Sequence, residues 1–534
     1  MERLELTHPV FSTRAMRDAD LATIEEFGIP GYTLMESASR AAAEVIQSRF
    51  GVRAGSNLLV LAGHGNNGGD GLAIARILAG RQVSVTVVTT AAPGASSPEA
   101  EKNLGLLTTM QREGSCDLRV LGADAPVSEL AREADVVVDA LLGIGVTGRL
   151  REPIRSLALA CEAAKHVVAI DIPTGLDSDR GVCTDEAAVR AEITITMAAP
   201  KPGLLFGEGR AAAGEVVVAD IGIPPHIVGR ALTQLGSARL ATDEMIAALL
   251  PERAGDAHKN SAGRVLVVAG SDAYTGAAAL ASMAAGRTGA GYVTCASTPS
   301  VRAAIDAQSP ATATIALPTS PTGGLTAEAA EEVVGRAARA DALLIGPGLG
   351  QESTTVALVG ELLERLDLPV VIDADGLNAL SMLNPARFTP EQRSRWVLTP
   401  HLGEFKRLVA AAGPPLDEAD LERRTWLTPT WARRLGSTLM LKGAPTVTAL
   451  PDGTTFVATE VHSSLAVAGA GDVLAGMIAG FISQGLGPAE AAVCAQHIGN
   501  AVAAAWASGR AGGAMQPTDV TEALPQVMRE RFGA

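Results

Sequence analysis

The sequence has few aromatic residues and an excess of acidic over basic residues. Lys and Arg total 43 against 58 Asp and Glu in 534 residues, which gives a formal net charge of −15. Such a chain lacks the basic patches that nucleic acid or an anionic membrane surface requires. Aromatic residues make up only 3%, so stacking platforms for single-stranded nucleic acid are not expected. We therefore expect small-molecule partners, with no nucleic acid and no membrane as a partner.

The chain also lacks regularly spaced cysteines and a long uninterrupted apolar run. The five cysteines are scattered, at Cys116, Cys161, Cys183, Cys295 and Cys494. This placement is typical of buried thiols in a reducing compartment. The most apolar long stretch, 465–482, is interrupted by Asp472 and by glycines, which predicts a buried loop and helix rather than a membrane span. Because the first eleven residues contain no apolar signal-peptide region, we expect a cytoplasmic protein.

Short β-branched runs alternate with Ala-rich helical stretches along the whole chain. Apolar residues amount to 47%, enough to bury substantial cores. The expected strands are 57–62, 83–89, 136–141, 167–172, 193–197, 265–269, 342–345, 370–372, 396–398 and 438–441. Such runs between glycine turns and helices predict parallel strands buried on both faces. The predicted fold class is α/β, with two three-layer units in tandem.

Two consecutive prolines, Pro224 and Pro225, follow the last strand pattern of the first half, and the next pattern begins only at Arg264. We predict a first domain over 1–225, a linker over 226–240 and a second domain over 241–534. Helices are expected from residue 12 or 13 to 28 and from 33 to 50. The apolar face of the second helix predicts core or subunit contact, and we expect a homo-oligomer.

A dense glycine cluster, GHGNNGGDG at 63–71, lies between the expected strand 57–62 and a helix expected over 72–78. A glycine turn at a helix N-terminus binds pyrophosphate through free N–H groups. The oxygens of Asn66, Asn67 and Asp70 could hold a monovalent cation or a ribose hydroxyl. Asp139 and Asp171 stand at two further strand ends, where ligands of parallel sheets bind; alternatively, each caps the element that follows it.

The motifs GNNGGDG and DIPTGLD (171–177) resemble the NAD(P)H-hydrate epimerase family, over about residues 10–225. The resemblance implies a Rossmann-like fold and epimerisation at C6 of the hydrated nicotinamide, with Asp171 as the acid/base candidate. It implies a potassium ion held by Asn67, Asp139 and Thr174, although the family usually has Ser at the last position. It implies NAD(P)HX contacts at Asn66, Asn67, Gly68, Gly69, Asp70, Gly143, Ile144, Gly145, Val146, Thr147, Gly148, Arg149 and Asp171.

The second half carries five glycine-rich or polar motifs after successive expected strands, GSDAYTGAA, IGPGLG, IDAD, LTPHLGEF and LKGAPT, and then a glycine turn, GAGD, at an expected helix start. In the last motif, a glycine turn supplies N–H donors for a phosphoryl group beside Asp472 as general base; alternatively, Asp472 caps a helix from Val473. Glu404 could position a magnesium-bound phosphate or only stabilise a helix start. His401 could contact substrate or be structural, and Lys442 could face a phosphate or solvent.

This half resembles the ADP-dependent NAD(P)H-hydrate dehydratase family, a ribokinase-like branch, over about residues 241–530. The resemblance implies a ribokinase-like fold and magnesium with ADP, where ATP is a possible substitute. Asp472 would assist attack of the 6-hydroxyl on the terminal phosphoryl group. The chain reads GAGD where GTGD or GSGD is commoner, and HKNSAG where HKG is usual. The implied substrate contacts are Ala277, Gly348, His401 and Asp472. The implied nucleotide contacts are Lys442, Gly443, Ala444, Pro445, Thr446 and Gly471.

Together the two resemblances predict a bifunctional NAD(P)H-hydrate repair enzyme that epimerises the R and S forms of NAD(P)HX and dehydrates the S form at the expense of ADP. Two alternatives remain at this point. The second half could be a vitamin-type small-molecule kinase that releases a stable phosphorylated product. The first half could be a non-catalytic nucleotide-binding module that recruits partners.

Overall fold

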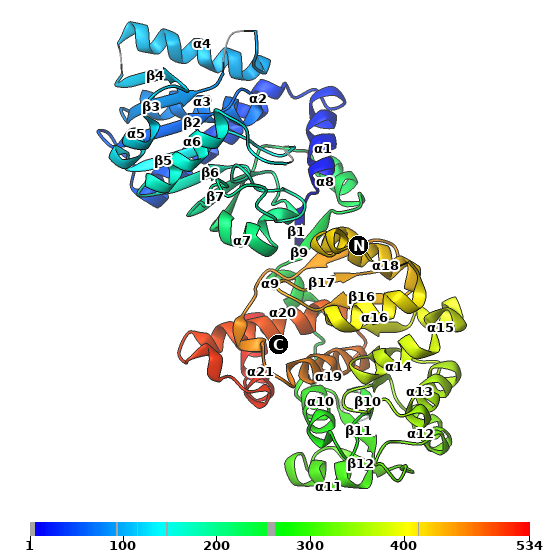
Figure 1. Cartoon of the computed structure of the whole chain (residues 1–534). Helices are drawn as coiled ribbons and strands as arrows, with labels where there is room; N and C mark the ends of the chain where they lie inside the picture. Colours follow the sequence, from blue (N-terminus) through cyan, green and yellow to red (C-terminus); the bar gives the residue numbers. More distant parts are fainter. Residues whose placement is uncertain (1–5, 92–93, 115, 146–147, 254–261, 415) are drawn as a thin grey trace. The chain divides into compact units, whose positions relative to one another are not determined.

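The computed structural model describes residues 6–91, 94–114, 116–145, 148–253, 262–414 and 416–534. The chain divides into two compact units (Figure 1). The N-terminal unit is Pro9–Ser237, and the C-terminal unit combines residues 6–8 with Ala238–Ala534. No helix in these ranges is both long enough and apolar enough to span a bilayer.

The N-terminal unit is built on a seven-stranded sheet in the order β4-β3-β2-β5-β6-β7-β8, with every neighbouring pair parallel. Successive strands are added outward from β2 to β4 on one side of the sheet and from β5 to β8 on the other. The carboxyl ends of β2 and β5 therefore form the switch point where ligands of such sheets bind. Its strands are β2 (Asn57–Ala62), β3 (Ser84–Thr89), β4 (Leu118–Gly122), β5 (Val136–Ala140), β6 (Val167–Ile170), β7 (Ile193–Met197) and β8 (Glu215–Ala219).

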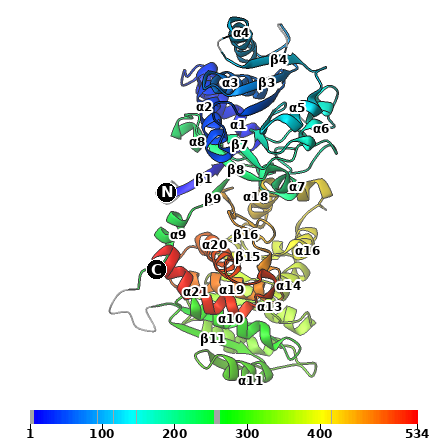
Figure 2. The same cartoon turned by 90° about the vertical axis from the view of Figure 1, so that its left-hand side faces the viewer.

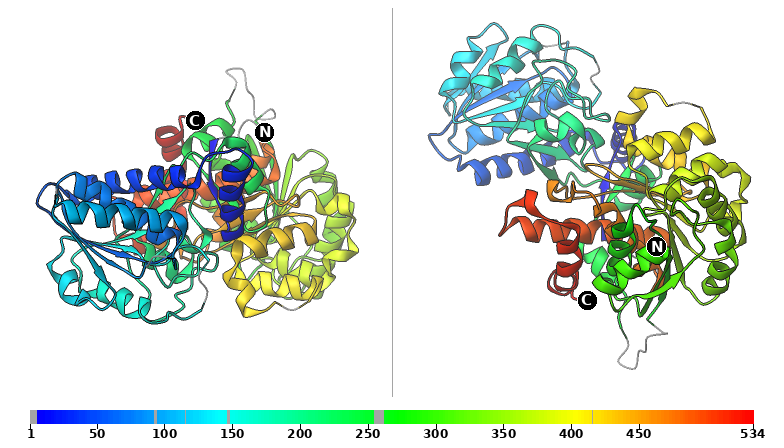
Figure 3. Two further views of the ribbon diagram at one scale, coloured as in Figure 1. Left: turned by 90° about the horizontal axis from the view of Figure 1, so that it is seen from above. Right: turned by 60° about the horizontal axis from the view of Figure 1, so that its bottom comes forward.

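Helices cover both faces of this sheet (Figure 3, left). One apolar core joins the sheet to the helices near the start of the chain, and a second joins it to the shorter helices between β4 and β6. The layers confirm the expected three-layer α/β arrangement. The helices are α1 (Thr13–Glu25), α2 (Gly31–Phe50), α3 (Asn66–Gly80), α4 (Pro98–Glu113), α5 (Val127–Glu133), α6 (Ile154–Ala160), α7 (Gly207–Ala213) and α8 (Pro225–Leu232).

The C-terminal unit has an eleven-stranded mixed sheet in the order β1-β9-β18-β17-β16-β15-β14-β13-β10-β11-β12. The strands from β16 to β12 in this order pair in parallel, whereas β17 pairs antiparallel with both β16 and β18. The direction in which strands are added changes here as well, between β10 and β13. The strands are β1 (Thr7–Val10), β9 (Ala238–Ala241), β10 (Arg264–Val268), β11 (Tyr292–Ser297), β12 (Ala313–Ala316), β13 (Ala342–Ile345), β14 (Val370–Ile372), β15 (Trp396–Leu398), β16 (Thr438–Leu441), β17 (Val447–Ala449) and β18 (Thr455–Val457).

Two helical layers enclose this sheet as well. Helices α10, α19, α20 and α21 lie side by side over one face (Figure 2), with their apolar side chains in one core. Helices between β12 and β16 bury a second core on the other face. The helices are α9 (Asp243–Leu249), α10 (Thr275–Arg287), α11 (Pro299–Gln308), α12 (Ala330–Ala337), α13 (Ser353–Arg365), α14 (Asp375–Leu383), α15 (Pro390–Arg393), α16 (Leu402–Ala412), α17 (Glu418–Glu422), α18 (Arg424–Leu435), α19 (Ala470–Ser483), α20 (Pro488–Ala507) and α21 (Pro517–Phe532).

Three expected boundaries differ from the structure. The stretch 226–240, expected as a linker, contains most of α8, which packs on α1, and then the start of β9. Strand β1, at the start of the chain, belongs to the eleven-stranded sheet beside β9. The glycine cluster 63–71 was expected to precede its helix, but α3 begins at Asn66. Helix propensity disfavours glycine, yet close packing against neighbouring backbone outweighs it here.

Candidate functional site

A cavity of about 450 Å³ lies at the carboxyl edge of the N-terminal sheet, at the switch point between β2 and β5. It is lined by the start of α3, the loop after β5, the end of β6 and one side of α1. The sequence analysis placed candidate substrate contacts on three of these segments. Those that line the cavity are Asn66, Asn67, Asp70, Gly143, Ile144, Gly145 and Asp171.

The remaining candidates of this set lie elsewhere or cannot be placed. Gly68 and Gly69 are packing positions: a Cβ at Gly68 would lie 1.9 Å from the carbonyl oxygen of Gly63, and one at Gly69 would lie 2.6 Å from the Met35 side chain. Gly148 and Arg149 are exposed and do not line the cavity. Val146 and Thr147 fall outside the residues that the structure describes.

Asp139, Thr174 and Asn67 present buried oxygens beside this cavity. Asp139 is fully buried at the end of β5 and accepts hydrogen bonds from the backbone N–H and the hydroxyl of Thr174, both at 2.8 Å. Burial raises the pKa of Asp139 to about 6, against the lowering effect of these bonds. The Asn67 side chain is 8% exposed, and neither its amide oxygen nor its nitrogen has a hydrogen-bond partner among the described residues.

An unpaired buried amide is costly unless a ligand completes it. Asn67, Asp139 and Thr174 offer an amide, a carboxylate and a hydroxyl oxygen, the hard donors that suit a large monovalent cation. The donor set therefore fits the potassium ion that the sequence resemblance implies.

Asp171 follows β6 in a left-handed conformation, with φ of +64°. Non-glycine residues adopt this region at a cost and are frequent at functional sites. Its Oδ1 pairs with the ammonium group of Lys201, a side chain with no exposed surface. Lys201 Nζ also donates to the hydroxyl of Thr196 at 2.9 Å and to the carbonyl of Met197 at 3.1 Å. The ion pair with Lys201, which does not line the cavity, thus fixes the position of Asp171, the candidate acid/base group that does.

Three further carboxyl groups line the same cavity, those of Asp20, Asp70 and Glu99. Burial raises the pKa of Asp20, on α1, to about 6; Lys201 lowers it and Asp171 raises it. Burial also raises the pKa of Asp70, on α3, well above its usual range, and the charges of Asp171 and Asp20 add to the effect. Perturbed carboxyl groups that converge in a cavity are typical of catalytic sites.

The second site lies at the carboxyl edge of the C-terminal sheet, at the start of α19. Gly469, with φ of +92°, precedes the helix, and Asp472 stands in its first turn. Asp472 therefore lies inside the helix start rather than before a helix from Val473. The pKa of Asp472 is raised to about 7, by burial first and then by the charge of Asp373, against the lowering effect of Lys442. Such a carboxyl group can accept a proton near neutral pH.

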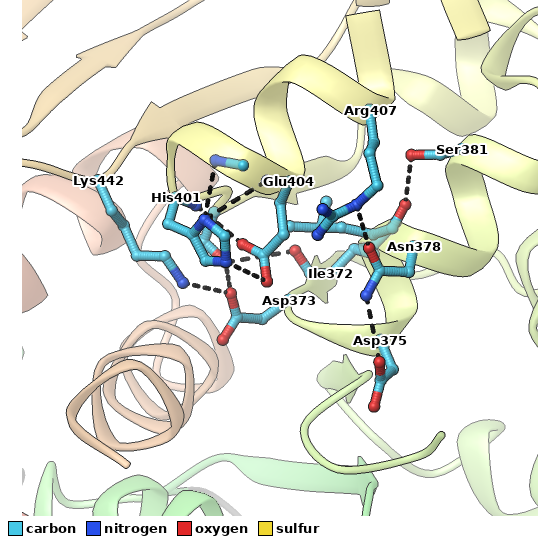
Figure 4. A network of polar contacts seen from close by, with 12 residues as sticks. Ile372, Asp373, Asp375, Asn378, Ser381, His401, Glu404, Arg407 and Lys442 are labelled. Atoms are coloured by element: carbon cyan, nitrogen blue, oxygen red, sulfur yellow. Dashed lines mark hydrogen bonds and ion pairs between the residues drawn. The ribbon is translucent and has the colours of Figure 1, made fainter. Parts of the chain in front are cut away.

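Lys442, after β16, meets Asp373, after β14, in the network drawn in Figure 4. The Lys442 ammonium group donates to Oδ1 of Asp373 at 2.7 Å, and Thr399 donates to the same oxygen at 2.8 Å. Burial lowers the pKa of Lys442, but Asp373 and Glu404 outweigh burial and the pKa is raised. A Cβ at Gly471 would lie 3.4 Å from Lys442 Nζ, so the glycine turn before Asp472 adjoins this ammonium group.

His401 and Glu404 form a reciprocal cap at the start of α16 (Figure 4). Nδ1 of His401 accepts from the N–H of Gly403 at 2.9 Å, and Oε2 of Glu404 accepts from the His401 N–H at 2.8 Å. The helix-start role weighed for Glu404 is therefore present in the structure. Because Nδ1 accepts, Nε2 of His401 carries the proton. Burial raises the pKa of Glu404, Lys442 lowers it and Asp373 raises it.

A second cavity, of about 530 Å³, lies beside Lys442 and has mainly apolar walls. Five of the six candidate nucleotide contacts line it: Lys442, Gly443, Ala444, Thr446 and Gly471. Pro445 is absent from the lining, although Arg424 binds its carbonyl oxygen at 2.9 Å and that of Lys442 at 2.9 Å. These two hydrogen bonds from Arg424 fix the backbone of the LKGAPT turn.

The candidate substrate contacts Ala277 and Gly348 touch one another away from this cavity. A Cβ at Gly348, where φ is +63°, would lie 3.0 Å from that of Ala277 and 2.8 Å from that of Tyr274. The loop that carries Gly348 is joined to the start of α14, because the N–H of Gly350 donates to the carboxylate of Asp375 at 2.9 Å. The described residues contain no group of three His, Cys, Asp or Glu side chains arranged to hold a metal.

The sequence analysis missed four residues that shape the two sites. Lys201 lies shortly after β7, and the search for polar residues at strand ends that singled out Asp139 and Asp171 would have found it there. Asp373 belongs to the quoted IDAD motif but was given no role. Arg17 lies against Gly145, where a Cβ would be 1.7 Å from its guanidinium nitrogen, and Asp20 is one helical turn further on α1. No spacing signal marks either helix residue.

Two glycine-rich helix starts, each with carboxyl groups at the carboxyl edge of its own sheet, define a two-domain α/β protein of the nucleotide-binding class. Comparison with known families agrees with this division. Residues 31–203 match the family described as YjeF-related protein N-terminus. Residues 265–526 match the family described as NAD(P)H-hydrate dehydratase.

Relatives match the two domains in one chain. The bifunctional NAD(P)H-hydrate repair enzyme Nnr of Salinibacter ruber is 42% identical over 99% of this chain and 97% of its own length. The protein of that name from Moorella thermoacetica is 38% identical over 96% and 95%, respectively. The chain therefore belongs to the family of bifunctional NAD(P)H-hydrate repair enzymes.

A solved structure is similar to part of this chain. The ADP/ATP-dependent NAD(P)H-hydrate dehydratase from Bacillus subtilis is 28% identical, and the match covers 55% of this chain and 98% of that one, with a TM-score of 0.45.

Proposed function

We propose that the chain repairs hydrated nicotinamide cofactors in two steps. The N-terminal unit interconverts the R and S forms of NAD(P)HX, and the C-terminal unit converts the S form to NAD(P)H at the expense of ADP. The observation that carries this proposal is the presence of two separate cavities, each beside a glycine-rich helix start and acidic side chains. Neither cavity depends on a residue of the other unit.

In the N-terminal unit, Asp171 is proposed as the acid/base group that acts at C6 of the hydrated ring. The start of α3 and the loop after β5 would hold the nucleotide through backbone N–H groups and the oxygens of Asn66 and Asp70. Asn67, Asp139 and Thr174 would hold potassium, whose positive charge would stabilise anionic groups of the substrate near the turn. The negative net charge of the chain is compatible with this, because backbone donors and a bound cation can replace basic side chains.

In the C-terminal unit, Asp472 is proposed to accept the proton of the 6-hydroxyl as the hydroxyl oxygen attacks the terminal phosphoryl group of ADP, and AMP departs. Inorganic phosphate then leaves C6 with the C6–O electron pair, the ring nitrogen lone pair assists, and loss of a C5 proton restores NAD(P)H. Phosphorylation is needed because hydroxide is a poor leaving group. The N–H groups at the start of α19 and the ammonium group of Lys442 lie where they can stabilise phosphoryl charge.

Magnesium would accompany the nucleotide, since this ion is usually held by phosphates and only one or two carboxylates. Glu404 is the proposed protein contact, and Lys442, Gly443, Ala444, Thr446 and Gly471 form the proposed nucleotide pocket. Ala277, Gly348 and the Nε2–H of His401 are proposed to contact NAD(P)HX. We also propose that the protein acts in the cytoplasm as a homo-oligomer.

A mixture of R and S NADHX, incubated with the full chain, ADP and magnesium, tests the two activities together. We expect complete recovery of NADH by absorbance, with one inorganic phosphate and one AMP released per NADH. Recovery that stops at the S fraction would refute the epimerase half. A stable phosphorylated product without NADH would refute the dehydratase half and indicate a small-molecule kinase. Omission of ADP should leave R-to-S exchange intact and abolish NADH formation.

A further inference from the structure

Four carboxyl groups line the N-terminal cavity, those of Asp20, Asp70, Glu99 and Asp171, and the proposed function uses only Asp171 as an acid/base group. Asp20 comes from α1, Asp70 from α3 and Asp171 from the end of β6. Epimerisation by loss and return of water needs a proton donor for the departing hydroxyl and a proton acceptor for the returning water. One of these carboxyl groups must therefore donate the proton and another must accept it.

The environment of Lys201 assigns the acceptor role to Asp171. A protonated lysine has three N–H donors, and three acceptors surround Lys201 Nζ: Asp171 Oδ1, Thr196 Oγ1 and the Met197 carbonyl. The side chain has no exposed surface, and a charge buried in this way requires a counter-charge. Asp171 is therefore the carboxylate partner. Its Oδ2 is directed toward Gly143, where a Cβ would lie 3.5 Å away.

Asp20 reaches the same cavity from a different wall. In the part of the chain that the structure describes, its carboxyl group makes no hydrogen bond to another residue, so its oxygens are available to a ligand. Burial raises its pKa to about 6, Lys201 lowers the pKa and Asp171 raises it. A substantial fraction of Asp20 therefore keeps its proton just below neutral pH, while Asp171 is the charged partner of Lys201.

Asp70 lines the cavity from the start of α3, on the same segment as the proposed nucleotide contacts Asn66 and Asn67. Its pKa is raised well above the usual range, by burial first and then by Asp171 and Asp20. The variants below separate its role from that of Asp20. The other charged or titratable side chains that line the cavity are Arg17, His64 and Glu99.

We propose that Asp20 is the proton donor that works opposite Asp171 in this cavity, with Lys201 as the residue that positions Asp171 as the proton acceptor. The inference rests on the proposed epimerase function. The Asp20 proton passes to the C6 hydroxyl, the C6–O bond breaks with its electrons on oxygen, and water departs as the ring nitrogen lone pair forms the C6=N1 iminium. Water then adds to the other face, and its proton passes to Asp171. The reverse direction exchanges the two roles.

The test measures R-to-S exchange of NADHX without ADP, corrected for the spontaneous rate, from pH 5 to 8. For the wild-type chain we expect kcat/KM to fall as the pH rises through about 6, because Asp20 must carry its proton. Asp20→Asn should lower kcat about 100-fold or more and remove this falling limb. Asp18→Asn is the matched control, since Asp18 is an exposed neighbour on α1 that pairs with Arg14; it should retain the wild-type rate and limb.

The two proposals fail in different ways. A wild-type chain without exchange would refute the epimerase function itself. Wild-type exchange that Asp20→Asn leaves unchanged would refute only the role of Asp20. Loss of the falling limb in Asp70→Asn, with the limb kept in Asp20→Asn, would assign the donor role to Asp70 and overturn the inference. Unfolding is monitored by the melting temperature of the N-terminal unit.

Lys201 is tested through the separate kinetic constants of exchange. Lys201→Gln removes the ammonium group that binds Asp171 Oδ1 and should lower kcat with little change in KM for NADHX, whereas a general disruption of the cavity would raise KM as well. An unchanged kcat in a folded Lys201→Gln variant would overturn the positioning role; where that variant does not fold, the Asp20 and Asp70 variants still decide the proposal.

Discussion

The ammonium group of Lys442 lies 2.7 Å from Oδ1 of Asp373, a side chain at the end of β14 that is almost fully buried. The same carboxylate raises the pKa of Asp472, whereas Lys442 lowers it. The pair therefore has opposite electrostatic effects on the proposed general base of the C-terminal unit. Because Lys442 also lines the apolar cavity, one ion pair connects the proposed nucleotide pocket with the proposed base.

Asp373→Asn should move the pH dependence of dehydration. The substitution removes a negative charge that raises the pKa of Asp472 and releases Lys442, so the pKa of Asp472 should fall from about 7. Since the ionised form of Asp472 accepts the proton, wild-type kcat/KM should rise with pH through about 7. In the variant we expect this rising limb about one pH unit lower, together with a higher KM for ADP. The measurement is NADH formation from S-NADHX between pH 5 and 9.

Asp367→Asn is a suitable control for this experiment. Asp367 precedes the same strand β14, is exposed and pairs with Arg395, so its removal should leave the profile unchanged. A profile of Asp373→Asn that superimposes on the wild-type profile would contradict the electrostatic role of the Lys442–Asp373 pair.

Asp472→Asn should separate the two activities of the chain. Without a proton acceptor for the 6-hydroxyl, the rate of dehydration should fall about 100- to 10,000-fold. R-to-S exchange should keep its wild-type rate, because every proposed epimerase residue lies in the N-terminal unit. Parallel assays on one sample check this result. Equal loss of both activities would show that the variant is misfolded or that the two units are functionally coupled.

The regular elements could be predicted because their patterns are local. Expected strands 57–62, 193–197 and 342–345 have those same bounds as β2, β7 and β13. Strands at the sheet margins were missed, among them β1 and β9, because their burial patterns lack a continuous apolar run. Pairing between segments more than 200 residues apart in sequence leaves no local signal, so the contribution of β1 to the eleven-stranded sheet could not be foreseen.

Residues beside the N-terminal cavity could be anticipated where they follow strand ends, and could not where helix packing brings them in. Asp139 and Asp171 stand at strand ends and were singled out. Thr174 lies in the same motif as Asp171, and Lys201, which was missed, follows β7 at a strand end that was given no site residue. Asp20 reaches the cavity from a helix, and only the packing of that helix shows that it does.

Gly348→Ala should impair dehydration through the backbone. The residue has φ of +63°, and the added Cβ would lie 2.8 Å from the Cβ of Tyr274 and 3.0 Å from that of Ala277. An L-residue in this conformation costs about 1–3 kcal/mol, and the contact must be relieved by movement of the loop. We expect at least a tenfold higher KM for S-NADHX with a smaller change in kcat.

Gly335→Ala provides the comparison. Gly335 lies inside α12, and its added Cβ would meet no atom within 4 Å. Alanine there should stabilise the C-terminal unit by up to about 1 kcal/mol and leave both kinetic constants unchanged. An unchanged KM in Gly348→Ala would contradict the placement of this loop at the substrate site.

Potassium should stabilise the N-terminal unit, and the hydroxyl of residue 174 should be needed for that response. An ion that binds only the folded state stabilises by about 2.7 kcal/mol at a concentration 100-fold above its Kd. Thr174→Val removes a donor to Asp139 and an acceptor for the Leu142 N–H, so it should cost about 1–3 kcal/mol and abolish the response. Thr174→Ser keeps the hydroxyl and should respond as the wild-type chain does. Melting of the N-terminal unit is compared in potassium and sodium chloride at equal ionic strength; identical melting of the wild-type chain in the two salts would refute the proposed ion site.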